Sequence, residues 1–317
     1  MKHRYIFGPI PSRRLGLSLG IDLVPYKTCS LDCVYCECGG TTLLTTERKE
    51  YVPIAEVLKQ LDEVLKENID IDFVTFSGAG EPTLNSGIGE IVAFIKDNYP
   101  KKKICLLTNG TLFNDDELLE EIKDIDLVIP SLDAVLEEDF QKINKPAKSV
   151  DLESMIESMI EFRNKFNYDI WLEIFVIEGI NDSDKSIKKF KEVVAKLQPN
   201  KVQLNTIDRP GTESWVKTPS PETIKKFEDA LSTISLVEVI GAFKYTNKES
   251  QQYVDENARE LITSTLFRRP CTYDDLKFSL TISEEILNNE LLNLISIDII
   301  EEYENIRGKF YKMKNDG

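Results

Sequence analysis

Four of the six cysteines in this 317-residue chain lie within ten positions, in the stretch TCSLDCVYCECGG at residues 28–40. They are Cys29, Cys33, Cys36 and Cys38. In a reducing compartment, closely spaced thiols more often hold a metal or carry out redox chemistry than form disulfides. No apolar window reaches the length of a membrane helix, and the N-terminus lacks the apolar core of a secretory signal. We therefore expect a cytoplasmic protein with no membrane segment.

Three interpretations of the cysteine-rich stretch compete. Buried cysteines without a ligand fit poorly, because the surrounding residues are polar and turn-forming. Structural zinc usually draws on two separated pairs of Cys or His, whereas His3, Cys105 and Cys271 each stand singly. Ligation of an iron-sulfur cluster remains, because the spacing Cys-x3-Cys-x2-Cys gathers three thiolates in one short loop.

The charge of the chain is uneven. The formal net charge of −16 opposes loose attraction to nucleic acid or to an anionic membrane. Residues 1–40, however, carry five Lys and Arg against three acidic residues. The neighbourhood of the cysteines is therefore locally positive, which suits an anionic ligand or an anionic cluster.

Short apolar runs alternate with stretches of helical period along the first three quarters of the chain. In residues 53–68, for example, Ile54, Val57 and Leu61 share one face of a predicted helix. Repeated strand-helix pairs predict parallel βα units, in an open doubly wound sheet or in a closed or partly closed barrel. Both arrangements gather ligands where the strands end. The expected strands are residues 17–23, 73–78, 103–108, 126–131, 170–177, 201–207 and 235–241.

The chain after about residue 245 has a different pattern. Its sequence predicts helices at 257–267, 272–280 and 281–297, the last opening with a capping box of Thr281 and Glu284, and then a hairpin with its turn at Arg307-Gly308. This order resembles a winged-helix module, which implies nucleic-acid binding in many cases. Residues 251–317 carry eight basic against thirteen acidic residues, which argues against DNA binding and favours packing or a protein partner. We expect domains at 1–245 and 246–317.

The stretch Cys29-x3-Cys33-x-Tyr35-Cys36 resembles the signature of the radical S-adenosylmethionine (SAM) superfamily. In that family three cysteines hold three irons of a 4Fe-4S cluster, and the fourth iron binds SAM. A fourth thiolate would close that position. The resemblance implies that Cys29, Cys33 and Cys36 bind one cluster and that the aromatic Tyr35 belongs to the cofactor site. Cys38 is then a bystander, a substrate-side thiol or an alternative ligand.

Three later segments resemble the family's SAM contacts, and each follows an expected strand. In FSGAGEPTL, residues 76–84, two glycines would let the backbone approach the ligand and a glutamate would accept from its ammonium group. LLTNGTL at 106–112 resembles positions near the carboxylate and ribose, and IPSLDA at 129–134 offers groups for ribose hydroxyls. Each segment alone is also compatible with an ordinary turn. The implied SAM contacts are Gly78, Gly80, Glu81, Thr108, Asn109, Ser131 and Asp133.

The resemblance covers roughly residues 8–245 and implies an α/β fold, a partial (βα)6 TIM-like barrel. With the separate resemblance of the later residues, the expected fold is this barrel followed by a small α+β winged-helix-like module. The same stretch is similar to a branch grouped loosely with molybdenum-cofactor-type and wybutosine-synthesis-type members. Polar residues at the later strand ends are candidates for substrate contact, and so are two arginines before the first strand. The first set is Glu173, Glu178, Asn181 and Asp182 on or after the fifth strand and Asn205, Asp208 and Arg209 after the sixth; the second set is Arg13 and Arg14.

The implied activity is that of a radical SAM enzyme of the iron-sulfur oxidoreductase type. A reduced 4Fe-4S cluster passes an electron to SAM, and the resulting 5'-deoxyadenosyl radical abstracts hydrogen from a substrate that the sequence does not identify. Such an enzyme needs an electron donor such as flavodoxin or ferredoxin. Two alternatives stay open: an activase that generates a radical on a partner protein docked through the C-terminal module, and a non-catalytic iron-sulfur sensor whose tail contacts DNA.

Overall fold

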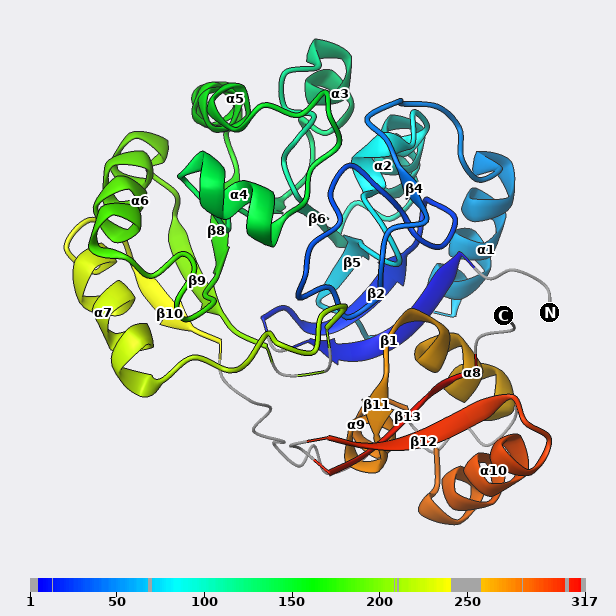
Figure 1. Ribbon diagram of the computed structural model, residues 1–317. Helices are drawn as coiled ribbons and strands as arrows, with labels where there is room; N and C mark the ends of the chain where they lie inside the picture. Colours follow the sequence, from blue (N-terminus) through cyan, green and yellow to red (C-terminus); the bar gives the residue numbers. More distant parts are fainter. Residues whose placement is uncertain are drawn as a thin grey trace.

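A curved eight-stranded sheet with helices along its outer face organises the larger part of the molecule (Figure 1). The computed structural model describes residues 5–12, 14–67, 70–207, 209, 211–240, 258–280, 282–305 and 308–314. The strand order is β1-β2-β5-β6-β7-β8-β9-β10, and every neighbouring pair is parallel except β1 with β2. The α/β partial barrel expected from the sequence is confirmed.

The large sheet contains strands at all seven expected places. Its strands are β1 Ile6–Ser12, β2 Gly16–Ile21, β5 Phe73–Phe76, β6 Lys103–Thr108, β7 Leu127–Pro130, β8 Asp169–Phe175, β9 Lys201–Asn205 and β10 Val237–Val239. The first of them, β1, is not among the expected strands, and it contains two prolines, which are unfavourable inside a sheet. Proline is tolerated on an edge strand, and β1 is the edge of this sheet.

Helices pack along the outside of the sheet. They are α1 Ile54–Lys66, α2 Ile88–Asn98, α3 Asp116–Glu121, α5 Leu152–Lys165, α6 Asp184–Leu197 and α7 Pro221–Leu231. Helix α4, Glu137–Ile143, lies further inward (Figure 1), and its end contacts residues 32 and 34. A small parallel pair, β3 Thr28–Cys29 with β4 Leu43–Leu44, and a short 3-10 helix, η1 Pro82–Leu84, lie in the loops at the carboxyl ends of the strands. Among the described residues, none of the helices combines the length and apolar character needed to cross a membrane.

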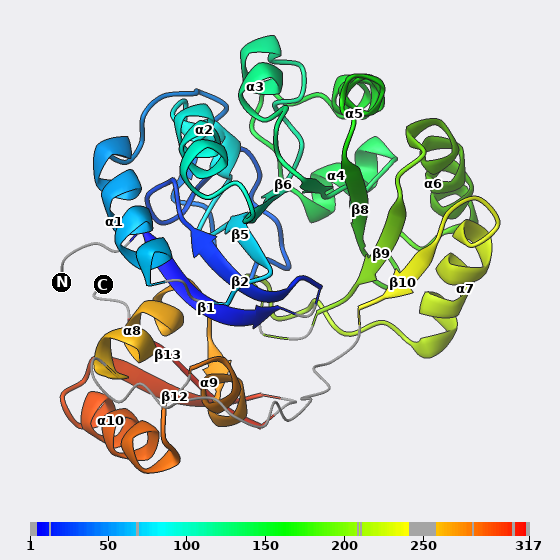
Figure 2. The same cartoon turned by 180° about the vertical axis from the view of Figure 1, so that it is seen from behind.

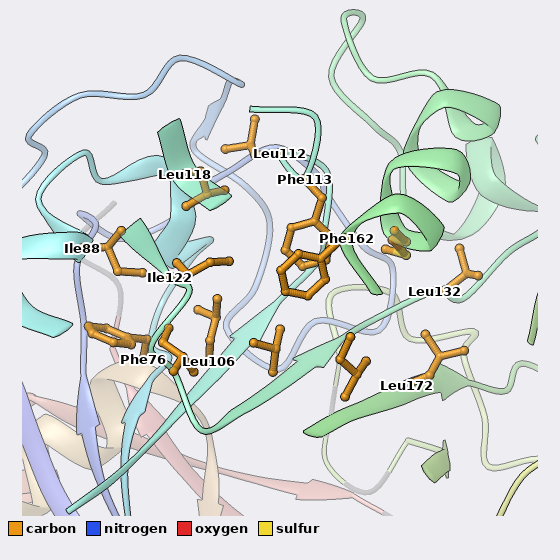
Figure 3. Close-up of a cluster of buried hydrophobic side chains, with 14 of the residues drawn as sticks. Phe76, Ile88, Leu106, Leu112, Phe113, Leu118, Ile122, Leu132, Phe162 and Leu172 are labelled. Atoms are coloured by element: carbon orange, nitrogen blue, oxygen red, sulfur yellow. The ribbon is translucent and has the colours of Figure 1, made fainter. Parts of the chain in front are cut away.

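The main core lies between the sheet and these helices. The apolar face predicted for α1 is buried, since Ile54, Val57 and Leu61 are almost inaccessible to solvent. Figure 3 shows how side chains from the strands meet the stacked rings of Phe113 and Phe162, whose centroids lie 4.3 Å apart. Because each fully buried large apolar side chain contributes about 1.5–3 kcal/mol, this layer fixes the strand ends that carry the polar residues.

The C-terminal module has its own small core beneath a three-stranded antiparallel sheet of order β11-β13-β12. Its elements are α8 Ala258–Arg268, β11 Cys271–Thr272, α9 Tyr273–Ser279, α10 Glu284–Ser296, β12 Ile300–Asn305 and β13 Gly308–Met313. The three predicted helices and the hairpin are present. The assignment to the winged-helix class stays a prediction, and the expected boundary at 245 lies outside the described residues.

The predicted capping box of α10 is wrong. Ser283 occupies the N-cap position, so Glu284 is the first helical residue and not the third. The proposed cap, Thr281, lies outside the described residues. Both full views place the module against β1, and α8 and α9 contact that strand (Figure 1, Figure 2).

Candidate cofactor site

The cysteine loop, residues 28–40, lies over the carboxyl ends of the parallel strands. Its backbone is held by the end of α4, because Asp32 N donates to Asn144 O at 2.8 Å and Val34 N donates to Ile143 O at 2.9 Å. On the other side, Glu81 N donates to the carbonyl oxygen of Thr28 at 3.0 Å. The loop is therefore fixed at its start and near its middle by backbone contacts from distant parts of the chain.

Each of the three predicted ligand cysteines has a side-chain N–H donor directed at its sulfur. The pairs are Lys27 Nζ with Cys36 Sγ at 2.8 Å, Asn144 Nδ2 with Cys33 Sγ at 3.3 Å and Asn109 Nδ2 with Cys29 Sγ at 3.5 Å. A thiolate accepts such bonds far better than a thiol does, and hydrogen bonds to sulfur tune the potential of a bound cluster. The fourth cysteine differs, because the Cys38 thiol donates to the carbonyl oxygen of Gly78 at 3.7 Å.

The cysteines of the loop also differ in the pKa of their thiols. The Cys38 thiol can turn its one proton from the Gly78 carbonyl oxygen to Cys36, and a hydrogen bond in that direction lowers the pKa of Cys36 to about 6, against the effect of burial and with help from the Lys27 ammonium group. Burial raises the pKa of Cys29 to about 12 and that of Cys33 well above its ordinary value. Burial also acts to lower the pKa of Lys27, yet the negative charge on Cys36 holds it above the usual value. Lys27 thus supplies positive charge directly beside the thiols.

The arrangement of the thiols is compatible with a cluster. Within the part of the chain that the structure describes, no three Cys, His, Asp or Glu side chains converge on one metal position. A zinc ion needs its ligands around one point, whereas the thiolates of an iron-sulfur cluster each bind a different iron. Three separated sulfurs in one loop, each with an N–H donor, meet the second requirement.

The glycine-rich segment after β5 packs directly beneath this loop. At Gly80, a Cβ would lie 1.9 Å from the carbonyl oxygen of Thr28, so only glycine permits the approach. Gly78 has a φ of +143°, and a Cβ there would lie 2.3 Å from the Asp22 carboxylate. Asp22 also accepts from Ala79 N at 3.3 Å, which holds the segment in place.

Glu81 joins two of the predicted SAM segments. Its buried carboxylate accepts from Thr108 Oγ1 at 2.7 Å, from Asn109 N at 2.8 Å and from Thr83 Oγ1 at 2.7 Å. Burial raises the pKa of Glu81, and these hydrogen bonds oppose that effect. The sequence-predicted residues 81, 108 and 109 are therefore brought together beside Cys29.

Asp133 joins the third predicted segment to the cysteine loop. It is buried and accepts from Tyr35 Oη at 2.5 Å, from Asn144 Nδ2 at 2.8 Å and from Phe175 N at 3.0 Å. The Tyr35 ring stacks on Phe175 with centroids 3.8 Å apart. Burial raises the pKa of Asp133 while the bonds from Tyr35 and Asn144 lower it. The geometry gives Asp133 a holding role for the loop, and its contact with ribose stays a prediction.

The candidate substrate residues divide into two groups. Arg14 forms an ion pair with Glu173 inside the curve of the sheet, and Ser131 Oγ lies 3.4 Å from the same carboxylate. By strand register, Glu173 pairs with Gln203 and Gln203 with Glu238, so these side chains form one row across neighbouring strands. We call Ser131, Glu173, Gln203 and Glu238 the inner row.

The other candidates lie elsewhere. Exposed Glu178 accepts from Ser220 and Thr223 at the start of α7, and Asp182 accepts from Gly179 N at 3.0 Å. The side chain of Asn181 is fully buried and donates to the carbonyl oxygens of Asp133 and Phe175, so it supports the fold. Asn205 accepts from the neighbouring Thr206 N at 2.9 Å. Arg13 and Asp208 lie outside the described residues, and Arg209 pairs with Glu37 and Asp275.

From its sequence, Lys27 belongs to the positive neighbourhood of the cysteines, but its contact with a particular thiol was not predicted. No role in the site was predicted for Asp22 or Asn144. Asn144 lies more than one hundred positions away from its partner Cys33 and belongs to no motif. Only the packing of α4 against the loop brings it there.

A curved, mostly parallel sheet with a three-thiol loop over its carboxyl edge defines a class of cofactor-binding partial barrels. The family model described as Radical SAM superfamily matches residues 23–190, and the chain belongs to this superfamily. Members bind a 4Fe-4S cluster and SAM, so these are the cofactors of this protein.

The relatives vary in how much of their length the chain spans. It is 33% identical over 95% of its length to a protein named GTPase Obg from Brachyspira hyodysenteriae, but it spans only 44% of that protein. It is 35% identical over 98% of its length to a UPF0026 protein from Methanocaldococcus jannaschii and spans 93% of that relative. A crystal structure of a radical SAM methyltransferase from Sphaerobacter thermophilus matches with a TM-score of 0.57 at 18% identity, over 70% of this chain and 65% of that one. That likeness supports the fold.

Proposed function

We propose that this protein is a radical SAM enzyme that reductively cleaves SAM and uses the resulting 5'-deoxyadenosyl radical to take hydrogen from a substrate. The observation that carries the proposal is the set of three thiols in one loop, each with its own N–H donor, beside the Glu81 segment. A small one-electron donor protein such as flavodoxin or ferredoxin would supply the electron.

In this proposal Cys29, Cys33 and Cys36 hold the cluster, and Cys38 does not. The Lys27, Asn109 and Asn144 donors support the negative charge on the three sulfurs. Cys38 instead donates its proton, which suits a thiol that stays protonated beside the cluster.

SAM would lie between the cysteine loop and the strand ends at Glu81, Thr108, Asn109, Ser131 and Asp133. Gly78 and Gly80 let the Asp22 carboxylate and the Thr28 carbonyl oxygen pack against this segment, which holds it beneath the cysteine loop. Tyr35 closes the opposite side, because its ring is fixed by Phe175 and its hydroxyl by Asp133. These contacts orient the cofactor and exclude water from the reacting carbon.

We propose that substrate contacts the inner row. Glu173 and Phe175 are two positions apart on β8, so their side chains face the same side of the sheet. Tyr35 of the cysteine loop packs on that side, against Phe175. Gln203 is fully buried, and its Oε1 has no hydrogen-bond partner among the described residues. A buried acceptor without a donor is costly, so the substrate offers an N–H or O–H group to it.

The test is anaerobic reconstitution with iron and sulfide, followed by dithionite and SAM, with 5'-deoxyadenosine measured by mass spectrometry. The intact protein should form 5'-deoxyadenosine, and Cys33→Ala should not. A protein that carries a 4Fe-4S cluster in full and never cleaves SAM would contradict the proposed activity. Untargeted comparison of metabolites between cells with and without the protein would then narrow the substrate.

A further inference from the structure

The C-terminal module contacts the barrel at the residues that support the cofactor loops. Arg268, the last residue of α8, lies with its guanidinium 4.2 Å from the ring of Phe7 on β1. Its Nε lies 3.5 Å from the carboxylate of Asp22. Both side chains are at most 10% exposed, so this ion pair is buried between the two parts of the molecule.

Asp22 is one contact away from the glycine-rich segment. Its carboxylate accepts from Ala79 N and occupies the space that Gly78 leaves free. The Cys38 thiol in turn donates to the carbonyl oxygen of Gly78. A guanidinium group from the C-terminal module therefore fixes the carboxylate on which this segment rests.

A second contact reaches the cysteine loop directly. The ring of Phe267 lies 5.2 Å from that of Tyr26, which precedes the loop. The Tyr26 hydroxyl donates to the carbonyl oxygen of Cys38. Tyr26 and Phe267 are 40% and 42% exposed, so the pair contributes little to the main core and acts chiefly on the loop.

A third contact crosses from the loop to the module through Arg209. Its side chain is 1% exposed and lies between Glu37 of the cysteine loop, at 3.3 Å, and Asp275 of α9, at 3.4 Å. Asp275 also forms the capping box of α9 with Thr272, which fixes its position. Glu37 stands between Cys36 and Cys38, so this bridge holds the last part of the loop.

We propose that the C-terminal module is a clamp that positions the cysteine loop and the glycine-rich segment, with Arg268 and Phe267 as positioning residues. The assignment of that loop as the cluster site rests on the proposed function, while the clamping itself does not. The module thus supports the cofactor site, because its contacts end on Asp22, on Tyr26 and, through Arg209, on Glu37. Asp22 holds the glycine-rich segment, Tyr26 donates to the Cys38 carbonyl oxygen, and Glu37 lies between two cysteines.

The test compares hydrogen exchange of residues 22–40 in the full-length, cluster-free chain and its Arg268→Met variant. Methionine keeps contact with Phe7 and removes the charge. We expect exchange to rise at least about fivefold, the lower end of the coupling usual between protein sites. Arg268→Lys keeps the charge and should fall between the two. The control is Arg259→Met, which breaks a more exposed ion pair with Glu290 inside the module and should leave exchange unchanged.

A second variant guards against general unfolding. Phe267→Ala removes a half-exposed ring and should raise exchange in residues 22–40 without changing that of α10. After reconstitution, Arg268→Met and Phe267→Ala should each lose iron to excess chelator faster than Arg259→Met does. Unchanged hydrogen exchange in both Arg268→Met and Phe267→Ala overturns the clamp, whatever the protein does with SAM. Raised exchange in an intact protein that never cleaves SAM supports the clamp and overturns the proposed function.

Discussion

Replacement of Asp133 by asparagine tests the hydrogen-bonded centre that joins β7, β8 and the cysteine loop. One carboxylate oxygen accepts from Phe175 N, so the new amide group must take the place of the other oxygen. There it faces two donors, the Tyr35 hydroxyl and Asn144 Nδ2. Tyr35 can turn its hydroxyl and accept. Asn144 can accept only by turning its amide, which would place oxygen in place of the N–H directed at Cys33.

The stability lost in Asp133→Asn follows from the number of hydrogen bonds that the charged Asp133 carboxylate accepts. Each hydrogen bond to a charged group contributes about 1.5–3 kcal/mol, and one or two are lost or weakened, so the free energy of unfolding should fall by about 3 kcal/mol. Urea unfolding of the cluster-free chain measures this value. Asp139→Asn is the matched control, because Asp139 is also buried but accepts one bond, from Ser186, which the asparagine oxygen can still accept; only the charge on that acceptor is lost, and about 1 kcal/mol is expected. If both variants lose the same amount, Asp133 is not the centre of the network.

Three further predictions concern the loop, the glycine segment and the module. Cys38→Ala should retain full cluster iron and absorbance after anaerobic reconstitution, whereas Cys33→Ala should lose both; equal iron content in the two would refute the ligand assignment. Gly80→Ala should lower SAM affinity and stability, because its Cβ meets a carbonyl oxygen at 1.9 Å, while at Gly40 the nearest atoms lie 3.9 Å from a Cβ and Gly40→Ala should bind SAM normally in equilibrium dialysis. Leu291→Ala should cost about 2–5 kcal/mol in urea unfolding, because this α10 side chain is buried in the module's own core, and a loss below about 1 kcal/mol would contradict that packing.

Local patterns predicted much of the barrel. Apolar β-branched runs marked the parallel strands because such strands are buried on both faces, and the amphipathic period of residues 53–68 matched the buried face of α1. Strand β1 escaped prediction because its prolines are acceptable only at an edge, and edge position is a property of the whole sheet. The start of α10 was misplaced because Ser283 competes with Thr281 as a cap within the same few residues.

The site divides in the same way. The sequence located the cysteine motif and the segments at Glu81 and Asp133, which the structure brings together, because each is a short local pattern; their roles as ligands and SAM contacts stay a proposal. Contacts between distant segments could not be predicted, because no local pattern links Asn144 to Cys33 or Arg268 to Asp22. These contacts hold the loop in place, and they depend on the tertiary structure, which brings distant parts of the chain together.

The most direct measurement of the central claim is electron-nuclear double resonance on the reduced protein with SAM labelled by 15N at its amino group and 17O at its carboxylate. Ligation of the cluster by Cys29, Cys33 and Cys36 alone leaves one iron open, so both labels should show hyperfine coupling to the cluster. Absence of coupling from a fully assembled, SAM-saturated cluster would contradict the account.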